Sequence, residues 1–118
     1  MSESVAWLLE LTIKPGQRSA FEVVMRDMIA SARAEPGTLN YEWWIAEDGA
    51  SCQVYERYRD PAAVLSHLGA FHTKFAERFL PLITATRFVV YGAKAPEVRD
   101  ALAGFAPLHL ARLDGFSR

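Results

Sequence analysis

The spacing of apolar residues changes several times along this chain, between the two-residue period of a strand and the roughly 3.6-residue period of a helix. Alternation, or a run of β-branched and aromatic side chains, marks four segments as strands: residues 5–13, 38–46, 51–58 and 84–91. Helical spacing marks two further segments: residues 17–34 and 61–79. The sequence therefore predicts the order strand, helix, strand, strand, helix, strand.

Turn and capping residues separate these segments. Residues 47–49 (Glu-Asp-Gly) lie between two strands and predict a hairpin. Asp60–Pro61 predicts a helix start, because a carboxylate caps free N–H groups and proline suits the first helical position. Gly69, in the middle of the second helix, predicts a kink or a break. After the last strand we expect a short helix over residues 95–103 and a weaker strand within residues 107–113.

This order of elements is that of the ferredoxin-like split βαβ fold, an α+β arrangement with a four-stranded antiparallel sheet and two helices on one face. We expect residues 1–92 to form this domain and residues 93–118 to form a C-terminal extension. Two helices cover only one face of the sheet, yet Leu8 and Trp44 place large apolar groups on the other face. Because so large an apolar patch is unusual on a monomer, the sequence predicts a homodimer, with the extension taking part in the contact.

Net charge, the length of apolar runs and the cysteine count limit which partners and which cellular compartment the sequence favours. A formal net charge of -1 over 118 residues provides no basic face for phosphate, so nucleic acid is not the expected partner. No apolar run reaches the roughly 18 residues of a membrane span, and no membrane is expected. The single cysteine, Cys52, cannot form an internal disulfide. Together with a polar start that has no signal-peptide pattern, this favours a cytoplasmic protein.

His67 and His72 are the candidate catalytic residues. They lie five residues apart on one predicted helix, about 140° apart around its axis, so they cannot converge on one metal ion. No metal-binding motif accompanies them, and no metal is expected. Each histidine borders the apolar stripe that faces the sheet, where it could take or give a proton near neutral pH. The structural alternative is that both only hydrogen-bond to backbone or a carboxylate.

A second group of residues is expected to line a pocket between the helices and the sheet. Aromatic side chains in strands are more often core residues, but combined with a few polar groups they suit a small, flat organic molecule. Glu56, if buried, must be paired with an arginine or a histidine, and is then an anchor or a base. The candidate substrate-binding residues are Trp7, Asn40, Tyr41, Trp43, Glu56 and Phe71.

Several short segments resemble the antibiotic biosynthesis monooxygenase (ABM) family. They are residues 14–16 (Lys-Pro-Gly), 35–41 (EPGTLNY), 55–60 (YERYRD) and 67–75 (HLGAFHTKF), together with Phe21 in the first helix. No one of them is specific, but their order and spacing are, over roughly residues 5–91. The resemblance implies the ferredoxin-like fold in a dimeric α+β barrel. It also implies monooxygenation of a small aromatic or quinol-type substrate without a cofactor.

In the reaction that the resemblance implies, the substrate itself reduces dioxygen once it has been deprotonated in an apolar cavity. His72 or His67 is then the base, and Tyr41 or Asn40 is a donor that holds the resulting oxyanion. No flavin, haem or metal is expected. Two other functions remain open: an isomerase or lyase that uses a histidine for proton transfer, and a protein that binds a small metabolite without turnover.

Overall fold

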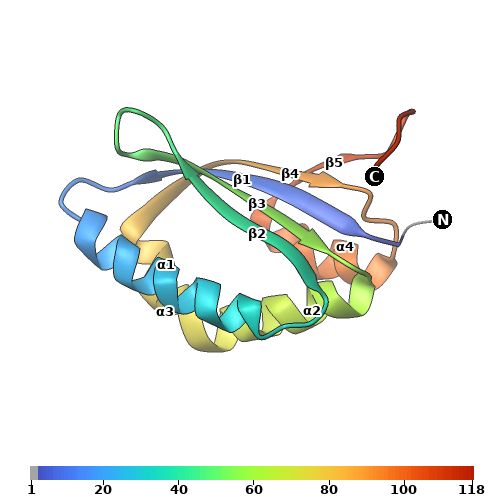
Figure 1. The fold of residues 1–118 in the computed structure, drawn as a ribbon, viewed down its shortest axis with the longest axis horizontal. Helices are drawn as coiled ribbons and strands as arrows, with labels where there is room; N and C mark the ends of the chain where they lie inside the picture. Colours follow the sequence, from blue (N-terminus) through green and yellow to red (C-terminus); the bar gives the residue numbers. More distant parts are fainter. Residues whose placement is uncertain (1–2) are drawn as a thin grey trace.

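A five-stranded sheet with helices on one of its faces makes up the computed structural model, which describes residues 3–118 (Figure 1). The strands are β1 (Val5–Ile13), β2 (Thr38–Ile45), β3 (Ser51–Tyr58), β4 (Ile83–Tyr91) and β5 (Leu108–Leu110). They lie in the order β2-β3-β1-β4-β5. All neighbouring strands are antiparallel except β4 and β5, which are parallel. The predicted ferredoxin-like fold is confirmed, and β5 adds a fifth strand.

The segment predicted as one helix over residues 61–79 is divided in the structure. Asp60 caps its start by accepting the backbone N–H of Ala63 at 2.9 Å. The regular helix ends one residue after Gly69 and a π-helical turn follows, so the predicted interruption is confirmed. The helical segments are α1 (Arg18–Arg33), α2 (Pro61–Ala70), the π-helical turn η1 (Phe71–Phe75), α3 (Ala76–Phe79), η2 (Leu80–Leu82), α4 (Pro96–Leu102) and η3 (Ala103–Phe105). None of the helices within residues 3–118 has the length and apolar character needed to cross a bilayer.

Alternate residues of β1 face the helices and divide the core into two clusters. Val5 and Trp7 belong to one cluster, and Leu11 and Ile13 belong to the other. All four are buried, whereas Leu9 between them is only partly buried. The packing is therefore incomplete at the middle of β1, between two well-packed ends.

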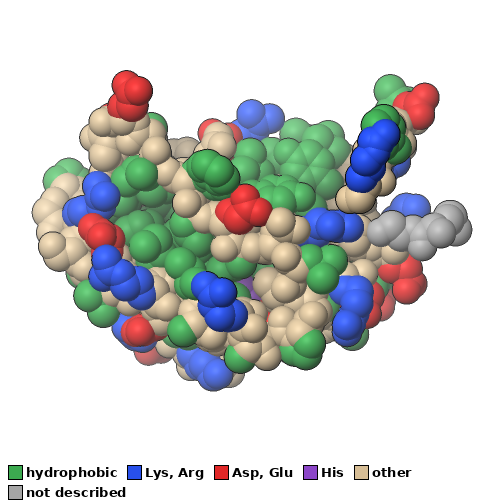
Figure 2. All heavy atoms as spheres, viewed as in Figure 1, with side chains coloured by type: hydrophobic (Ala, Val, Ile, Leu, Met, Phe, Trp, Pro, Cys, Tyr) green, Lys and Arg blue, Asp and Glu red, His purple; other side chains and the backbone are tan. Residues whose placement is uncertain are grey.

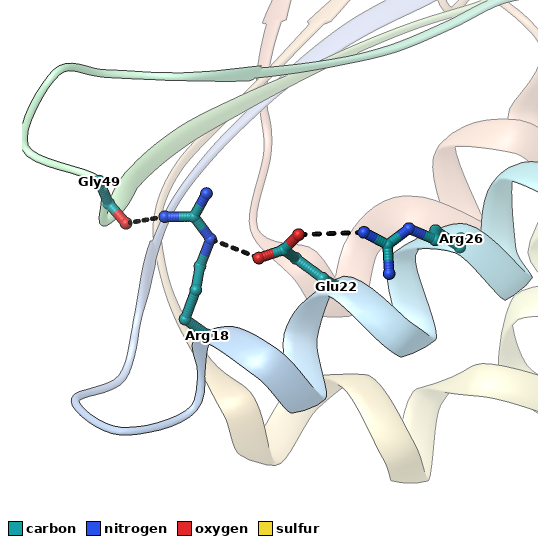
Figure 3. A network of polar contacts seen from close by, with 4 residues as sticks. All are labelled: Arg18, Glu22, Arg26 and Gly49. Carbon is teal, nitrogen blue, oxygen red and sulfur yellow. Dashed lines mark hydrogen bonds and ion pairs between the residues drawn. The ribbon is translucent and has the colours of Figure 1, made fainter.

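Polar side chains hold α1 against the turn between β2 and β3 (Figure 3). Arg18 donates from Nη1 to the carbonyl of Gly49 at 2.9 Å and from Nε to the carboxylate of Glu22 at 3.0 Å. Arg26 donates to the other oxygen of Glu22 at 3.1 Å. Gly49 has φ +73°, which glycine adopts without strain. The two exposed ion pairs lie within α1 and contribute little stability each. The bond from Arg18 to the Gly49 carbonyl is the contact that joins the hairpin to the start of α1.

The C-terminal extension packs onto the same chain before it leaves the surface. Val98 and Leu102 of α4 are fully buried in the cluster that contains Trp7. β5 confirms the weak strand prediction over part of its range and pairs with the edge of β4. Beyond β5 the chain projects away from the sheet, where Leu113 and Phe116 are exposed (Figure 1).

Candidate active site

A cavity of about 320 Å³ lies between the sheet and the helices, where the two core clusters meet. Its wall is mainly aliphatic and aromatic, and its few polar groups come from Tyr41, Trp43, Glu56 and His67. This size and composition suit a small organic ligand. The full lining is Trp7, Leu9, Met28, Tyr41, Trp43, Val54, Glu56, His67, Leu68, Phe71, Phe79, Leu80, Ile83, Ala85, Phe88, Leu102, Gly104 and Phe105.

Three of these side chains form a row across the sheet. Tyr41 of β2 pairs with Glu56 of β3, and Glu56 pairs in turn with Trp7 of β1. Paired residues point to the same face of a sheet, so the Glu56 carboxylate projects toward the helices between two aromatic rings. It is 6% exposed. A carboxylate this deeply buried must be paired with a cation or a donor.

His67 of α2 is the partner of this carboxylate, and it also contacts a second one. Its Nε2 lies 3.3 Å from Oε1 of Glu56, and its Nδ1 lies 2.9 Å from Oε1 of Glu35. Tyr58 donates its hydroxyl to the same oxygen of Glu56 at 2.5 Å, and Thr38 donates to Oε1 of Glu35 at 2.7 Å. We call these five residues the carboxylate–histidine network. Its imidazole lies between two acids, one of which, Glu56, lines the cavity.

The network favours the protonated form of His67. Burial alone lowers the pKa of this imidazole, but the hydrogen bonds and negative charges of Glu56 and then Glu35 outweigh burial and raise it. The imidazolium can donate from both nitrogens at once, one bond to each carboxylate. Burial, followed by the charge of Glu56, raises the pKa of the Tyr58 hydroxyl, which therefore stays a neutral donor. The network can thus hold a proton beside the cavity and exchange it at Glu56.

Packing fixes the orientation of the imidazole. The ring centroid of His67 lies 5.0 Å from that of Tyr58, 5.4 Å from Tyr41 and 6.4 Å from Trp7. The two ring nitrogens face different carboxylates, so the acids do not converge on one point. The described part of the chain holds no cluster of three or more His, Cys, Asp or Glu side chains suited to a metal ion.

A close backbone approach brings Glu35 to this network. A Cβ on Gly37 would lie 2.5 Å from Cβ of Ala63, so only glycine allows the turn before β2 to lie against α2. Glu35, at that turn, thereby reaches His67 of α2. Glu35 and Tyr58 were not among the predicted site residues. Glu35 is part of a turn signal in the sequence, and nothing local indicates that its carboxylate is directed inward.

Six of the eight predicted site residues meet in the cavity wall: Trp7, Tyr41, Trp43, Glu56, His67 and Phe71. His72 does not. It is exposed on the π-helical turn and stacks on Phe105, with ring centroids 6.0 Å apart. Asn40 does not line the cavity either. It neighbours Tyr41 on β2, so its side chain points to the opposite face, where it donates to Glu42 at 2.8 Å.

The C-terminal extension supplies part of the wall, which was not predicted. Leu102, Gly104 and Phe105 line the cavity on the side of α4 and η3. The sequence offers one indirect signal, the apolar residues at helical spacing in residues 95–103, which need a surface to pack against. The predicted role of residues 93–118 was a dimer contact alone.

The fold and the cavity together define an α+β domain of the ferredoxin-like class with a largely apolar cavity between its sheet and helices. The family model described as "Antibiotic biosynthesis monooxygenase" matches residues 4–78. The chain belongs to this family, as the resemblance in the sequence indicated.

Individual relatives differ in how much of the chain they match. The Mycobacterium tuberculosis protein Rv0793 is 33% identical over 72 residues, which are 61% of this chain and 71% of that protein. The crystal structure of MupZ from Pseudomonas fluorescens is similar with a TM-score of 0.86 and 24% identity, covering 99% of this chain and 96% of MupZ. SnoaB from Streptomyces nogalater, a cofactor-independent oxygenase, has a TM-score of 0.66 and 19% identity, covering 80% and 96%. The likeness to MupZ thus includes the extension.

Proposed function

We propose that this protein is a monooxygenase that oxidises a small aromatic or quinol-type substrate in its cavity without a flavin, haem or metal cofactor. The observation that carries the proposal is the Glu56 carboxylate, held by His67 in the wall of a largely apolar cavity. Membership of the family supports the reaction class, and SnoaB provides a member of the same fold that works without a cofactor. Cys52 is free and buried, and the fold needs no oxidising compartment, which suits a cytoplasmic enzyme.

The proposed chemistry begins with a proton transfer. Glu56 accepts a proton from an acidic O–H or C–H of the substrate, and the His67 imidazolium stabilises the charge that develops beside it. In an apolar cavity the resulting anion is poorly solvated and electron-rich, so it can reduce dioxygen itself. One oxygen atom then enters the substrate and the other leaves as water. A hydroquinone would yield a hydroxyquinone and water, which balances atoms and electrons without another reductant.

The same network also supports a second candidate function, a proton-transfer isomerase or lyase. The specific observation in its favour is that His67 contacts two carboxylates, which makes an acid–base site whether or not oxygen takes part. A binding protein without turnover is the third candidate. These candidates differ in whether dioxygen is consumed, and that difference can be measured directly.

We expect the protein to consume one molecule of dioxygen per substrate with at least one member of a panel of benzo- and naphthohydroquinones. An oxygen electrode follows uptake, and mass spectrometry with labelled dioxygen should find one labelled atom in the product. Heat-unfolded protein is the control for autoxidation. Conversion of a panel member without oxygen uptake would favour the isomerase or lyase. Binding without conversion of any member would favour the non-catalytic protein, and either result contradicts the monooxygenase.

We also propose that the protein is a homodimer joined through the sheet face opposite the helices. On that face the partly exposed Leu8 lies beside the partly exposed Tyr55 in the strand register, and Trp44 of β2 is 61% exposed. Figure 2 shows hydrophobic side chains gathered at the level of the sheet, with acidic and basic side chains among them and below them. The exposed Leu113 in the projecting tail would find a surface on the second copy.

Light scattering at micromolar concentration should therefore give about twice the chain mass of 13.2 kDa. Leu8→Arg places a charge in the proposed interface and should shift the protein to a monomer. Val23→Arg is the matched control, because Val23 is exposed on α1, away from this face. A wild-type chain that is monomeric at this concentration contradicts the proposal.

A further inference from the structure

The cavity reaches the surface where its lining residues are exposed. Most of them are buried or partly buried, but four are exposed: Leu80, Ala85, Gly104 and Phe105. These four come from η2, β4 and η3, so the three elements border the mouth of the cavity. Glu56 and His67 also line the cavity but are buried. A ligand therefore has to pass η2, β4 and η3 before it reaches Glu56.

The ring of Phe105 lies at this mouth and joins two elements there. Its centroid lies 6.0 Å from that of His72 on η1, with the ring planes 20° apart. It lies 5.9 Å from the centroid of Phe88 on β4, in an edge-to-face contact. Phe105 lines the cavity and is also 37% exposed, so it separates the interior from solvent. Its ring thus bridges the π-helical turn and the sheet where a ligand enters.

The backbone around Phe105 suits a side chain that moves. Ala106 has φ +51°, and within residues 3–118 no other residue with a Cβ has a positive φ. Such backbone is strained in alanine and persists only where the surrounding packing holds it. On the other side of Phe105, a Cβ added to Gly104 would meet no atom within 4 Å. Phe105 therefore has open space beside it and a strained residue after it, and two ring contacts hold it in place.

These contacts also give a role to the π-helical turn and to His72. Single π-helical turns inside helices are frequent at functional sites. Thr73 secures this one by donating its hydroxyl to the carbonyl of Gly69 at 2.9 Å. His72 does not line the cavity, whereas its neighbour Phe71 does. The imidazole of His72 can therefore act on a ligand only through the ring that it stacks on.

We propose that Phe105 is the gate of the cavity, and that its ring must swing away from His72 and Phe88 for a ligand to enter or leave. A narrow opening of this kind selects substrates by width, so a single flat ring system that passes edge-on is favoured over a twisted one. The inference rests on the proposed function only in taking the cavity as the substrate site. Phe105 lies beyond residues 4–78, which the family model matches, so the gate belongs to the C-terminal extension.

Two fluorescent amines test the gate without requiring turnover. 1-Naphthylamine is a single flat ring system, whereas the two ring systems of N-phenyl-1-naphthylamine are twisted against each other. Stopped-flow fluorescence measures how fast each enters and leaves. In Phe105→Ala, both the association and the dissociation rate constant of the twisted amine should rise about tenfold, the combined value of two aromatic contacts. The flat amine should gain less, and Kd should change little for either, because a gate alters the barrier rather than the bound state.

His72→Ala separates a gate from a contact with the ligand. His72 is exposed, so this variant should fold even if Phe105→Ala does not. Both rate constants should rise about threefold with Kd unchanged, because one of the two contacts is lost. Combined with Phe105→Ala, it should add nothing further. Lys74→Ala, exposed on the same turn, is the matched control and should keep the wild-type rates.

Three results would overturn the gate. Wild-type rates in both Phe105→Ala and His72→Ala would show that the ring does not limit entry. A weaker Kd with an unchanged association rate in Phe105→Ala would make Phe105 a wall contact only. Either result leaves the proposed function standing. Failure of every variant to bind either amine would contradict the cavity as a ligand site, and so both proposals. Conversely, gated binding in a protein that consumes no oxygen would retain the gate and remove only the monooxygenase.

Discussion

Glu56→Gln is expected to lower kcat for the hydroquinone that is oxidised fastest by about 10²- to 10⁴-fold, the usual contribution of a general base. The amide has the shape of the carboxylate and can still accept the hydroxyl of Tyr58, so the cavity should keep its form. It cannot accept a proton from the substrate. KM should change little, because the apolar wall is intact. Oxygen uptake measures kcat, and ligand fluorescence titration checks binding separately.

The control for this variant is Glu42→Gln, which makes the same chemical change in the neighbouring strand. Glu42 lies on the opposite face of β2 from Tyr41, where it accepts a hydrogen bond from Asn40, and should leave kcat unchanged. The pH profile distinguishes a base from a positioning role, because removing the base also removes the acidic limb of the kcat profile. A Glu56→Gln enzyme with wild-type kcat and profile would exclude Glu56 as the base.

The fold was predictable because its signals are local and repeated. The alternation of Val5, Trp7, Leu9 and Leu11 set the inward face of β1, and the structure buries all of these residues except Leu9, which is partly buried. Gly69 marked the place where the second helix loses its regular form. Both signals follow from periodicity and backbone freedom, which each segment expresses without reference to the rest of the chain.

The site was predictable only where strand alternation determined its orientation. Trp7, Tyr41, Trp43 and Glu56 face inward for that reason. His67 and His72 could not be ranked, because both border the apolar stripe and only the packing of α2 and the π-helical turn separates them. Glu35 reaches His67 from 32 positions away in the sequence, through a turn that only the close approach at Gly37 permits. Such a contact depends on tertiary structure and leaves no periodic trace.

His67→Leu is expected to destabilise the protein by about 3 to 5 kcal/mol, because it leaves the buried Glu56 carboxylate and the partly buried Glu35 carboxylate without their cation. Leucine fills a similar volume, so the loss is mainly electrostatic. Urea unfolding followed by circular dichroism measures it. His72→Leu is the matched control and should stay within about 0.5 kcal/mol of wild type, since His72 is exposed. A His67→Leu protein as stable as the control would mean that the network contributes nothing to folding.

The dependence of this loss on pH identifies its cause. The pKa of His67 is raised in the folded state, so folding takes up protons on this group. The stabilisation that the charged His67 gives the folded state is fully present below the pKa that histidine has in the unfolded chain. It is lost as the pH rises through the higher pKa of His67 in the folded protein. An NMR titration of the imidazole locates that folded-state pKa. The difference in unfolding free energy between wild type and His67→Leu should therefore shrink over that interval. A difference that stays constant with pH would show that packing, rather than the imidazolium between Glu35 and Glu56, stabilises this site.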